Sequence, residues 1–114
     1  MDDCIFCKII AGDIPSDILY RDDEVIAFRD VNPVAPTHIL IVPVEHLVTT
    51  QDIPDGNTSL VASMFKTANR LADQERITEK GYRLVINCGE QGGQVVEHLH
   101  MHLIGGRQLS SSLG

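Results

Sequence analysis

Apolar residues along the chain gather into short runs that predict β-strands. Residues 18–20 and 25–28 lie on either side of a polar turn at residues 21–24, which is typical of a β-hairpin. Residues 38–42 combine β-branched and other apolar side chains, and Pro43 should end this central strand. Residues 82–87 and the alternating run 95–104 predict two further strands, the last of which ends at Gly105 and Gly106.

One longer segment has the periodicity of a helix. Its apolar residues recur at spacings of one, three and four and form one stripe that should pack into the core: Leu60, Val61, Met64, Phe65, Ala68, Leu71 and Ala72. One of Asp55, Asn57, Thr58 and Ser59 should cap its start. This order of elements predicts an α+β domain with a mainly antiparallel sheet. Since no repeat or linker divides the chain, we expect residues 1–114 to form a single domain.

The composition excludes several classes of function. The chain has 114 residues, 9 Lys and Arg against 16 Asp and Glu, and a formal net charge of −7. We therefore do not expect binding to nucleic acid or anionic membranes, although a local pocket can still hold a phosphate. The acidic N-terminal segment lacks a signal-peptide pattern, and no apolar run approaches the ~20 residues of a membrane span, so we expect a cytoplasmic protein. Three cysteines, an odd number, disfavour a disulfide framework.

The candidate chemistry lies in the last predicted strand. His98, His100 and His102 alternate with apolar residues, so the three imidazoles should share one face at spacings of roughly 6.5 Å. Three buried imidazoles are costly as a purely structural face, because each has two ring nitrogens that need partners. Either a metal site or nucleophilic catalysis by an imidazole would explain them.

A glycine-rich turn directly before the histidines favours catalysis on a phosphate. Backbone N–H groups around Gly92 and Gly93, with Asn87 and Gln94 beside them, could cradle a phosphate group. A metal-binding domain that uses the three histidines as ligands would leave this turn without a role.

The segment HLHMHLI at residues 98–104 resembles the signature of a known family, the histidine triad proteins, in their nucleotide-binding branch. The resemblance covers residues 4–108. Further matching segments are CIFCKII (4–10), FRDVNP (28–33), APTH (35–38), GGQ (92–94) and GGRQ (105–108). The resemblance implies the histidine triad fold, with one short and one long helix on a mainly antiparallel sheet. It also implies a homodimer in which the two sheets become continuous.

The resemblance implies covalent catalysis. His100 would attack the α-phosphate of a purine nucleotide, and water would release a nucleoside monophosphate such as AMP from the nucleotidyl-histidine. A backbone carbonyl would fix the tautomer of His100, His38 and His98 would line the same network, and His102 would contact the phosphate. This chemistry requires no cofactor.

The resemblance also assigns the nucleotide pocket. Asp30 would hold the ribose hydroxyls, and the remaining contacts would come from two groups of residues. The phosphate would lie on Asn87, Gly93, Gln94, Val95 and Val96, and the base would lie on Ile5, Phe6, Ile9, Phe28, Val31 and Leu40.

Two departures from the family pattern bear on the substrate. Val95 stands where several relatives have Ser or Thr, so a hydroxyl that could reach the leaving group is missing. The tail after Gln108 lacks the Trp-Pro-Pro ending of many relatives. We expect a nucleoside phosphoramidase, with a dinucleoside polyphosphate hydrolase and a nucleotide-binding module with little turnover as alternatives.

Cys4 and Cys7 form a C-x-x-C pair that allows a second site. Such a pair needs two more nitrogen or sulfur ligands for a structural zinc, and the resemblance supplies His46 and His98 as the matching positions. The alternative is that both cysteines are small buried hydrophobes. Cys88 stands apart and is expected to be a packing residue.

Overall fold

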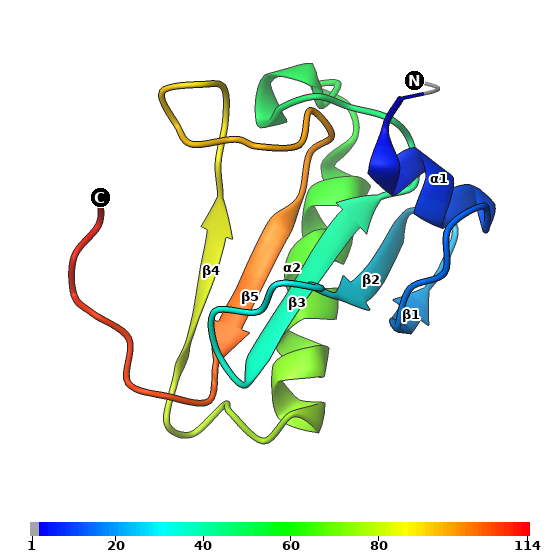
Figure 1. Cartoon of the computed structure of the whole chain (residues 1–114). Coiled ribbons are helices and arrows are strands. Elements are labelled where there is room, and N and C mark those ends of the chain that lie inside the picture. The colour runs from blue at the N-terminus through cyan, green and yellow to red at the C-terminus, as the bar shows by residue number, and fades with distance from the viewer. Residues whose placement is uncertain (1–2) are drawn as a thin grey trace.

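The computed structural model describes residues 3–114 and contains one five-stranded antiparallel sheet in the order β1-β2-β3-β5-β4 (Figure 1). The predicted α+β class, with a mainly antiparallel sheet and one short and one long helix, is confirmed. The strands are β1 (Ile18–Arg21), β2 (Val25–Arg29), β3 (Thr37–Pro43), β4 (Tyr82–Ile86) and β5 (Met101–Gly105). The helices are α1 (Ile5–Ala11) and α2 (Thr58–Gln74), with a 3-10 turn, η1, at Thr50–Asp52.

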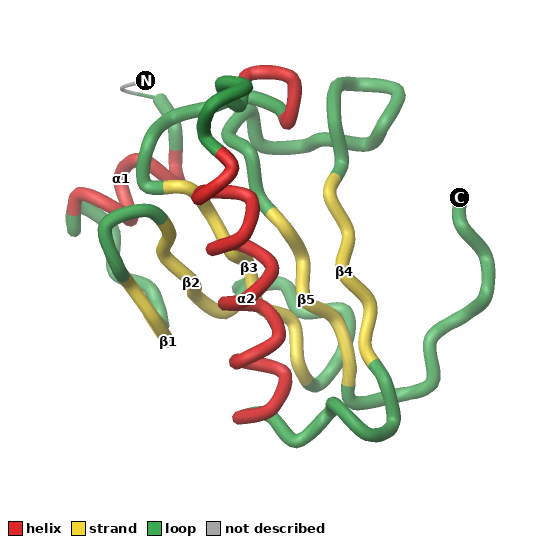
Figure 2. Tube along the Cα trace, turned by 180° about the vertical axis from the view of Figure 1, so that it is seen from behind, coloured by secondary structure: helices red, strands yellow, loops and turns green. Residues whose placement is uncertain are grey.

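The two helices cover opposite faces of the sheet. Helix α2 lies along one face, as the view from behind shows (Figure 2), and most of its apolar stripe packs in one cluster with Ile39, Ile41 and Met101. Val61 and Phe65, expected in the same stripe, are instead exposed. The side chain of Asn57 accepts from the N–H of Leu60 and caps the helix, as one of the predicted alternatives. Helix α1 lies on the other face, where the alternation of the strands places a second, smaller apolar cluster.

The last strand is shorter than the alternating sequence predicts. The expected strand at residues 95–104 begins only at Met101, so His98 and His100 precede the sheet. The cause is a bond from the N–H of Leu99 to the carbonyl of Leu47, 2.6 Å away, in a loop outside the sheet. The alternation itself persists, because Leu99, Met101 and Leu103 all face the α2 core.

An ion pair links the C-terminal end of α2 to the sheet. Arg29 at the end of β2 donates from both terminal nitrogens to the carboxylate of Glu75, at 2.8 and 3.0 Å, and Thr37 donates to the same group. The hydrogen bonds from Arg29 lower the pKa of Glu75. Within residues 3–114, no helix combines the length and apolar character that a membrane crossing requires.

Candidate active site

His100 is held in one tautomer by the backbone that precedes it. Its Nδ1 lies 2.7 Å from the carbonyl oxygen of His98. Because a carbonyl only accepts, Nδ1 carries the proton, and in a neutral imidazole the lone pair is then on Nε2. The ring is buried and stands edge-on to Phe6, with centroids 5.1 Å apart. The chain therefore presents a fixed imidazole whose free nitrogen can act as a nucleophile.

His102 and His38 form a second, connected pair. Strands β3 and β5 bring their side chains together, and Nε2 of His38 lies 2.9 Å from Nδ1 of His102. The N–H of Val34 donates to Nδ1 of His38, so the proton of His38 is on Nε2 and points at His102. His102 accepts on Nδ1 and keeps its own proton on Nε2. The carboxylate of Asp30 lies 3.4 Å from Nε2 of His38.

Burial holds His102 in the neutral form. Its pKa falls from 6.5 to about 4, mainly through burial and further through the neighbouring His100 and His38, while Asp30 opposes the shift. Its ring centroid is 4.9 Å from that of His100. A neutral His102 is a hydrogen-bond donor beside the nucleophile across the physiological pH range.

The residues expected around the base divide into a buried set and an exposed set. Phe6, Ile9, Phe28 and Leu40 are buried in one cluster, with Val96 packed against it, and the rings of Phe6 and Phe28 meet edge-on at 5.5 Å. Ile5 is 47% exposed and Val31 is 85% exposed, so neither belongs to that cluster. Such exposed apolar side chains could only contact a base as the rim of a pocket.

The glycine-rich turn is braced by the two polar residues expected to serve it. Asn87 donates from its amide to the carbonyl of Gly92 at 2.8 Å. The Gln94 side chain accepts from the N–H of Gly89 and donates to the carbonyls of Val48 and Val96. At Gly92 a Cβ atom would lie 2.3 Å from the carbonyl oxygen of Cys88, so only glycine fits there. These hydrogen bonds and the glycine at position 92 therefore fix the conformation of the turn.

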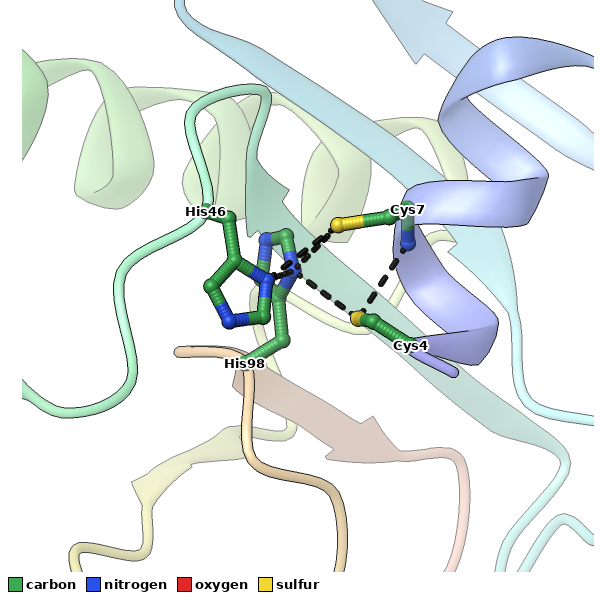
Figure 3. Close-up of side chains that lie close together, drawn as sticks. All are labelled: Cys4, Cys7, His46 and His98. Atoms are coloured by element: carbon green, nitrogen blue, oxygen red, sulfur yellow. Dashed lines mark hydrogen bonds between the residues drawn. The ribbon is translucent and has the colours of Figure 1, made fainter. Parts of the chain in front are cut away.

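Cys4, Cys7, His46 and His98 converge on one point, although Cys4 and His98 are 94 residues apart in sequence (Figure 3). Nδ1 of His98 lies 3.3 Å from the sulfur of Cys4, 3.6 Å from that of Cys7 and 3.1 Å from Nδ1 of His46. The sulfur of Cys7 is 3.2 Å from Nδ1 of His46. All four donor atoms lie within 4.8 Å of one another.

This donor set fits a tetrahedral zinc. Bond lengths of about 2.0–2.1 Å to nitrogen and about 2.3 Å to sulfur place tetrahedral ligands roughly 3.3–3.8 Å apart, close to the distances observed. The Nε2 of His98 lies 2.9 Å from the carbonyl of Pro43 and donates to it, which leaves Nδ1 free for a metal. Burial, with a lesser contribution from Cys4, raises the pKa of Cys7, so zinc binding would displace a thiol proton.

A second group, Asp30, His38 and His102, also lies within metal-binding distance but is arranged for hydrogen bonding. The N–H of Val34 occupies Nδ1 of His38, so Nε2 must carry its proton and cannot bind a metal. The idea that His98, His100 and His102 together hold one metal also fails. His98 directs its Nδ1 toward the cysteines, and among residues 3–114 no group of metal-binding atoms within 4.8 Å of one another combines His98, His100 and His102.

Comparison with known proteins shows the family of this chain. A family model described as the HIT domain matches residues 11–109. The chain belongs to the HIT domain family. It is 49% identical over 112 residues to the purine nucleoside phosphoramidase of Escherichia coli (strain K12), covering 98% of this chain and 94% of that protein.

Solved structures of HIT proteins superpose on almost the whole chain. A HIT family hydrolase from Clostridium thermocellum is 45% identical, and the superposition covers 99% of this chain and 98% of that one with a TM-score of 0.94. The expected histidine triad fold is therefore confirmed. A zinc-bound histidine triad family protein from Mycobacterium smegmatis is 30% identical, with a TM-score of 0.83 over 99% of this chain and 81% of that one. The expected enzyme, a hydrolase of this family, is confirmed.

Several groups that shape the HIT site could not be found from sequence motifs. The carbonyls of Pro43 and Leu47 and the N–H of Val34 fix the orientations of His98, Leu99 and His38. Each of these contacts is made by backbone atoms, which every residue carries, so no residue type in the sequence announces them.

Proposed function

We propose that this HIT protein is a purine nucleoside phosphoramidase, which cleaves the bond between the α-phosphorus of a nucleotide and an amine. The observation that carries the proposal is the hydrogen bond from Nδ1 of His100 to the carbonyl of His98, which leaves Nε2 as a free nucleophile. The similarity to the E. coli phosphoramidase supports the same reaction.

The proposed reaction has two displacements. Nε2 of His100 bonds to the α-phosphorus while the phosphorus–nitrogen bond to the substrate amine breaks, and the amine leaves with its electron pair and gains a proton from water. A second water then attacks the phosphorus of the nucleotidyl-histidine. Its oxygen forms the new bond, the bond to Nε2 breaks, and the released water proton passes to solvent. The products are a nucleoside monophosphate and the free amine.

The neighbouring groups would stabilise the charge that develops on the phosphate. The Nε2–H of His102 would donate to a phosphate oxygen, because its Nδ1 is already occupied by His38. The N–H groups of Gly93 and Gln94, expected to hold the phosphate, instead donate to the carbonyls of Glu90 and Gly89, each at 3.0 Å. The remaining phosphate oxygens would therefore lie on the N–H groups of Val95 and Val96, with Asn87 beside them. Asp30 would accept from the ribose hydroxyls, and the cluster of Phe6, Ile9, Phe28 and Leu40, rimmed by Ile5 and Val31, would hold the base.

The test is turnover of adenosine 5′-phosphoramidate by the native protein and by His100→Ala. We expect native release of AMP and a loss of roughly 10³-fold or more in the variant, which keeps its affinity for AMP within a few-fold. AMP affinity, measured by calorimetry, shows that the variant pocket is intact. Turnover by His100→Ala at the native rate would refute the covalent mechanism.

Val95 favours a second candidate, a nucleotide-binding module with little turnover. Its side chain is 90% exposed and has no hydroxyl with which to assist a departing amine. Native protein that binds AMP but releases none from the phosphoramidate would support this candidate, and a Val95→Ser variant should then gain turnover. Faster cleavage of a dinucleoside polyphosphate than of the phosphoramidate would instead favour the polyphosphate hydrolase alternative.

We further propose that the Cys4, Cys7, His46 and His98 set holds a structural zinc. A zinc there would be a Lewis acid closed off by four protein ligands, and it would take no part in the phosphate chemistry. Metal analysis of the purified protein should give about one zinc per chain, against none in Cys7→Ser. Cys88→Ser is the matched control, because Cys88 lies outside the set.

The predicted homodimer also remains a proposal. Strand β4 is the last strand of the sheet, and on α2 the side chains of Val61 and Phe65 are exposed beside an apolar hollow of about 370 Å³. Pairing of two β4 strands would make the sheet continuous and could cover these side chains. Light scattering should give twice the chain mass of 12.6 kDa, and a monomer at micromolar concentration would contradict the proposal.

A further inference from the structure

His98 connects the two candidate sites through three separate atoms. Its Nδ1 points into the cysteine–histidine set, its Nε2 donates to the carbonyl of Pro43, and its own carbonyl accepts the proton of His100. The side chain is completely buried, so its position is set by these partners and by packing. Any change that turns or shifts His98 therefore moves the group that fixes the tautomer of the nucleophile.

Helix α1 makes a second connection between the same sites. Cys4 caps the helix and Cys7 lies in its first turn, so both thiols move with the helix. Phe6 stands between them in sequence, and its ring meets the rings of His98 at 5.9 Å and His100 at 5.1 Å. The same ring packs in the apolar cluster assigned to the base. Holding the two sulfurs in place thus also holds one wall of the nucleotide pocket.

A metal would hold these elements far more firmly than the thiols do alone. The thiols lie 3.2–3.6 Å from the imidazole nitrogens, and hydrogen bonds to sulfur at such distances are weak in comparison with coordinate bonds. Nδ1 of His46 and Nδ1 of His98 are 3.1 Å apart. Two thiolates and two neutral imidazoles around Zn²⁺ give a net charge of zero, which suits a partly buried site. Four coordinate bonds would join the start of α1, the loop after β3 and the segment before β5.

We propose that metal occupancy of the Cys4, Cys7, His46 and His98 set controls the affinity of the neighbouring site for its nucleotide and the tautomer of His100. His98 and Phe6 act as positioning residues, which set the tautomer of His100 and the wall of the base pocket. The inference rests on the proposed function, since it assumes that the nucleotide binds beside His100. It adds that the zinc and the nucleotide bind cooperatively, although they touch different atoms.

Cooperative binding is reciprocal, which gives a test that does not depend on turnover. If zinc tightens AMP binding by some factor, AMP must tighten zinc binding by the same factor. We expect a factor of roughly tenfold, within the 5–150-fold span common for coupled sites. The zinc affinity is measured by competition with a chromophoric chelator, with and without saturating AMP, and the AMP affinity by calorimetry in zinc-loaded and zinc-free protein.

A second measurement follows the tautomer of the His100 ring directly. Nitrogen NMR of the His100 ring should show one tautomer, with the proton on Nδ1, in the zinc-loaded protein. Removal of zinc should produce a mixture of tautomers or exchange broadening. His46→Asn, which removes one ligand without touching His100 or Phe6, should reproduce the zinc-free spectrum and the weaker AMP affinity. Cys88→Ser should behave as the native protein.

The outcomes separate the inference from the proposed function. Circular dichroism first establishes that the zinc-free protein and His46→Asn keep their helices; if only the zinc-free protein unfolds, His46→Asn carries the test. AMP that binds zinc-loaded and zinc-free protein equally, or a zinc affinity that AMP leaves unchanged within twofold, would overturn the coupling and leave the phosphoramidase proposal intact. Absence of zinc binding would overturn it as well. Failure of AMP to bind the zinc-loaded protein would refute the nucleotide site itself.

Discussion

The pKa of His102 makes a direct prediction about acid stability. The group has a pKa of about 4 in the folded chain against 6.5 ordinarily, so the unfolded chain takes up the proton first as the pH falls. The neutral form is favoured by folding, and its contribution to stability is fully present above pH 6.5. It is lost as the pH falls from about 6.5 to about 4. Between pH 7 and pH 5 the loss amounts to about 2 kcal/mol at 25 °C.

The structure gives this cost a concrete origin. Protonation of Nδ1 of His102 would set its new N–H against the N–H on Nε2 of His38, with the two nitrogens only 2.9 Å apart. The proton on Nε2 of His38 cannot move to Nδ1 of the same ring, because that Nδ1 already accepts a hydrogen bond from the N–H of Val34. A charged His102 therefore loses a hydrogen bond in addition to its solvation by water.

Two measurements check the prediction. Proton NMR of the His102 ring should show a midpoint at about pH 4. Urea unfolding of the native protein at pH 7 and pH 5, compared with His102→Gln, should show the extra loss of about 2 kcal/mol in the native protein alone. Zinc release at acid pH would affect both proteins alike, since the cysteine–histidine set is the same in both. A midpoint near pH 6.5, or equal losses in the two proteins, would refute the reasoning.

Two further substitutions test the supports of the site. Gly92→Ala would bring a Cβ atom to 2.3 Å from the carbonyl oxygen of Cys88, so the turn must shift; we expect kcat/KM to fall roughly tenfold or more, because small misplacements are costly in catalysis. The control is Gly56→Ala, where nothing lies within 4 Å, and equal kinetics in both variants would contradict the assigned role of the turn. Glu75→Gln breaks the pair with Arg29, whose side chain is 37% exposed, so after solvent screening we expect a loss of about 1 kcal/mol in urea unfolding with unchanged turnover. Unchanged stability in Glu75→Gln would show that the pair contributes nothing.

The sequence predicted the elements whose side-chain pattern is local. The helix at Thr58–Gln74 has an apolar stripe over several turns, and the hairpin of β1 and β2 has two apolar runs around a polar turn. Helix α1 has only seven residues, too few to establish a periodicity. The resemblance to the family implies a short helix but does not assign its residues.

The sequence failed where a distant backbone group competes with the local pattern. The alternation at residues 95–104 predicts a strand throughout, yet Leu99 bonds to Leu47 and the ladder begins at Met101. Pro43, expected to stop the strand before it, is instead the last residue of β3. Its lack of an N–H does no harm at a strand end, and its carbonyl serves His98. These partners lie tens of residues away and depend on the folded path of the chain.

The three histidines of the motif show how one residue type at one spacing acquires three roles. In each ring a neighbour occupies one nitrogen and so decides what the other can do. His98 donates a hydrogen bond from Nε2 to the carbonyl of Pro43, which leaves Nδ1 free for a metal. His100 donates from Nδ1 to the carbonyl of His98, which leaves Nε2 free to attack phosphorus. His102 accepts a hydrogen bond from His38 on Nδ1, so its own proton is on Nε2, which is left as a donor. The motif supplies the imidazoles, and two carbonyls and one further histidine assign their chemistry.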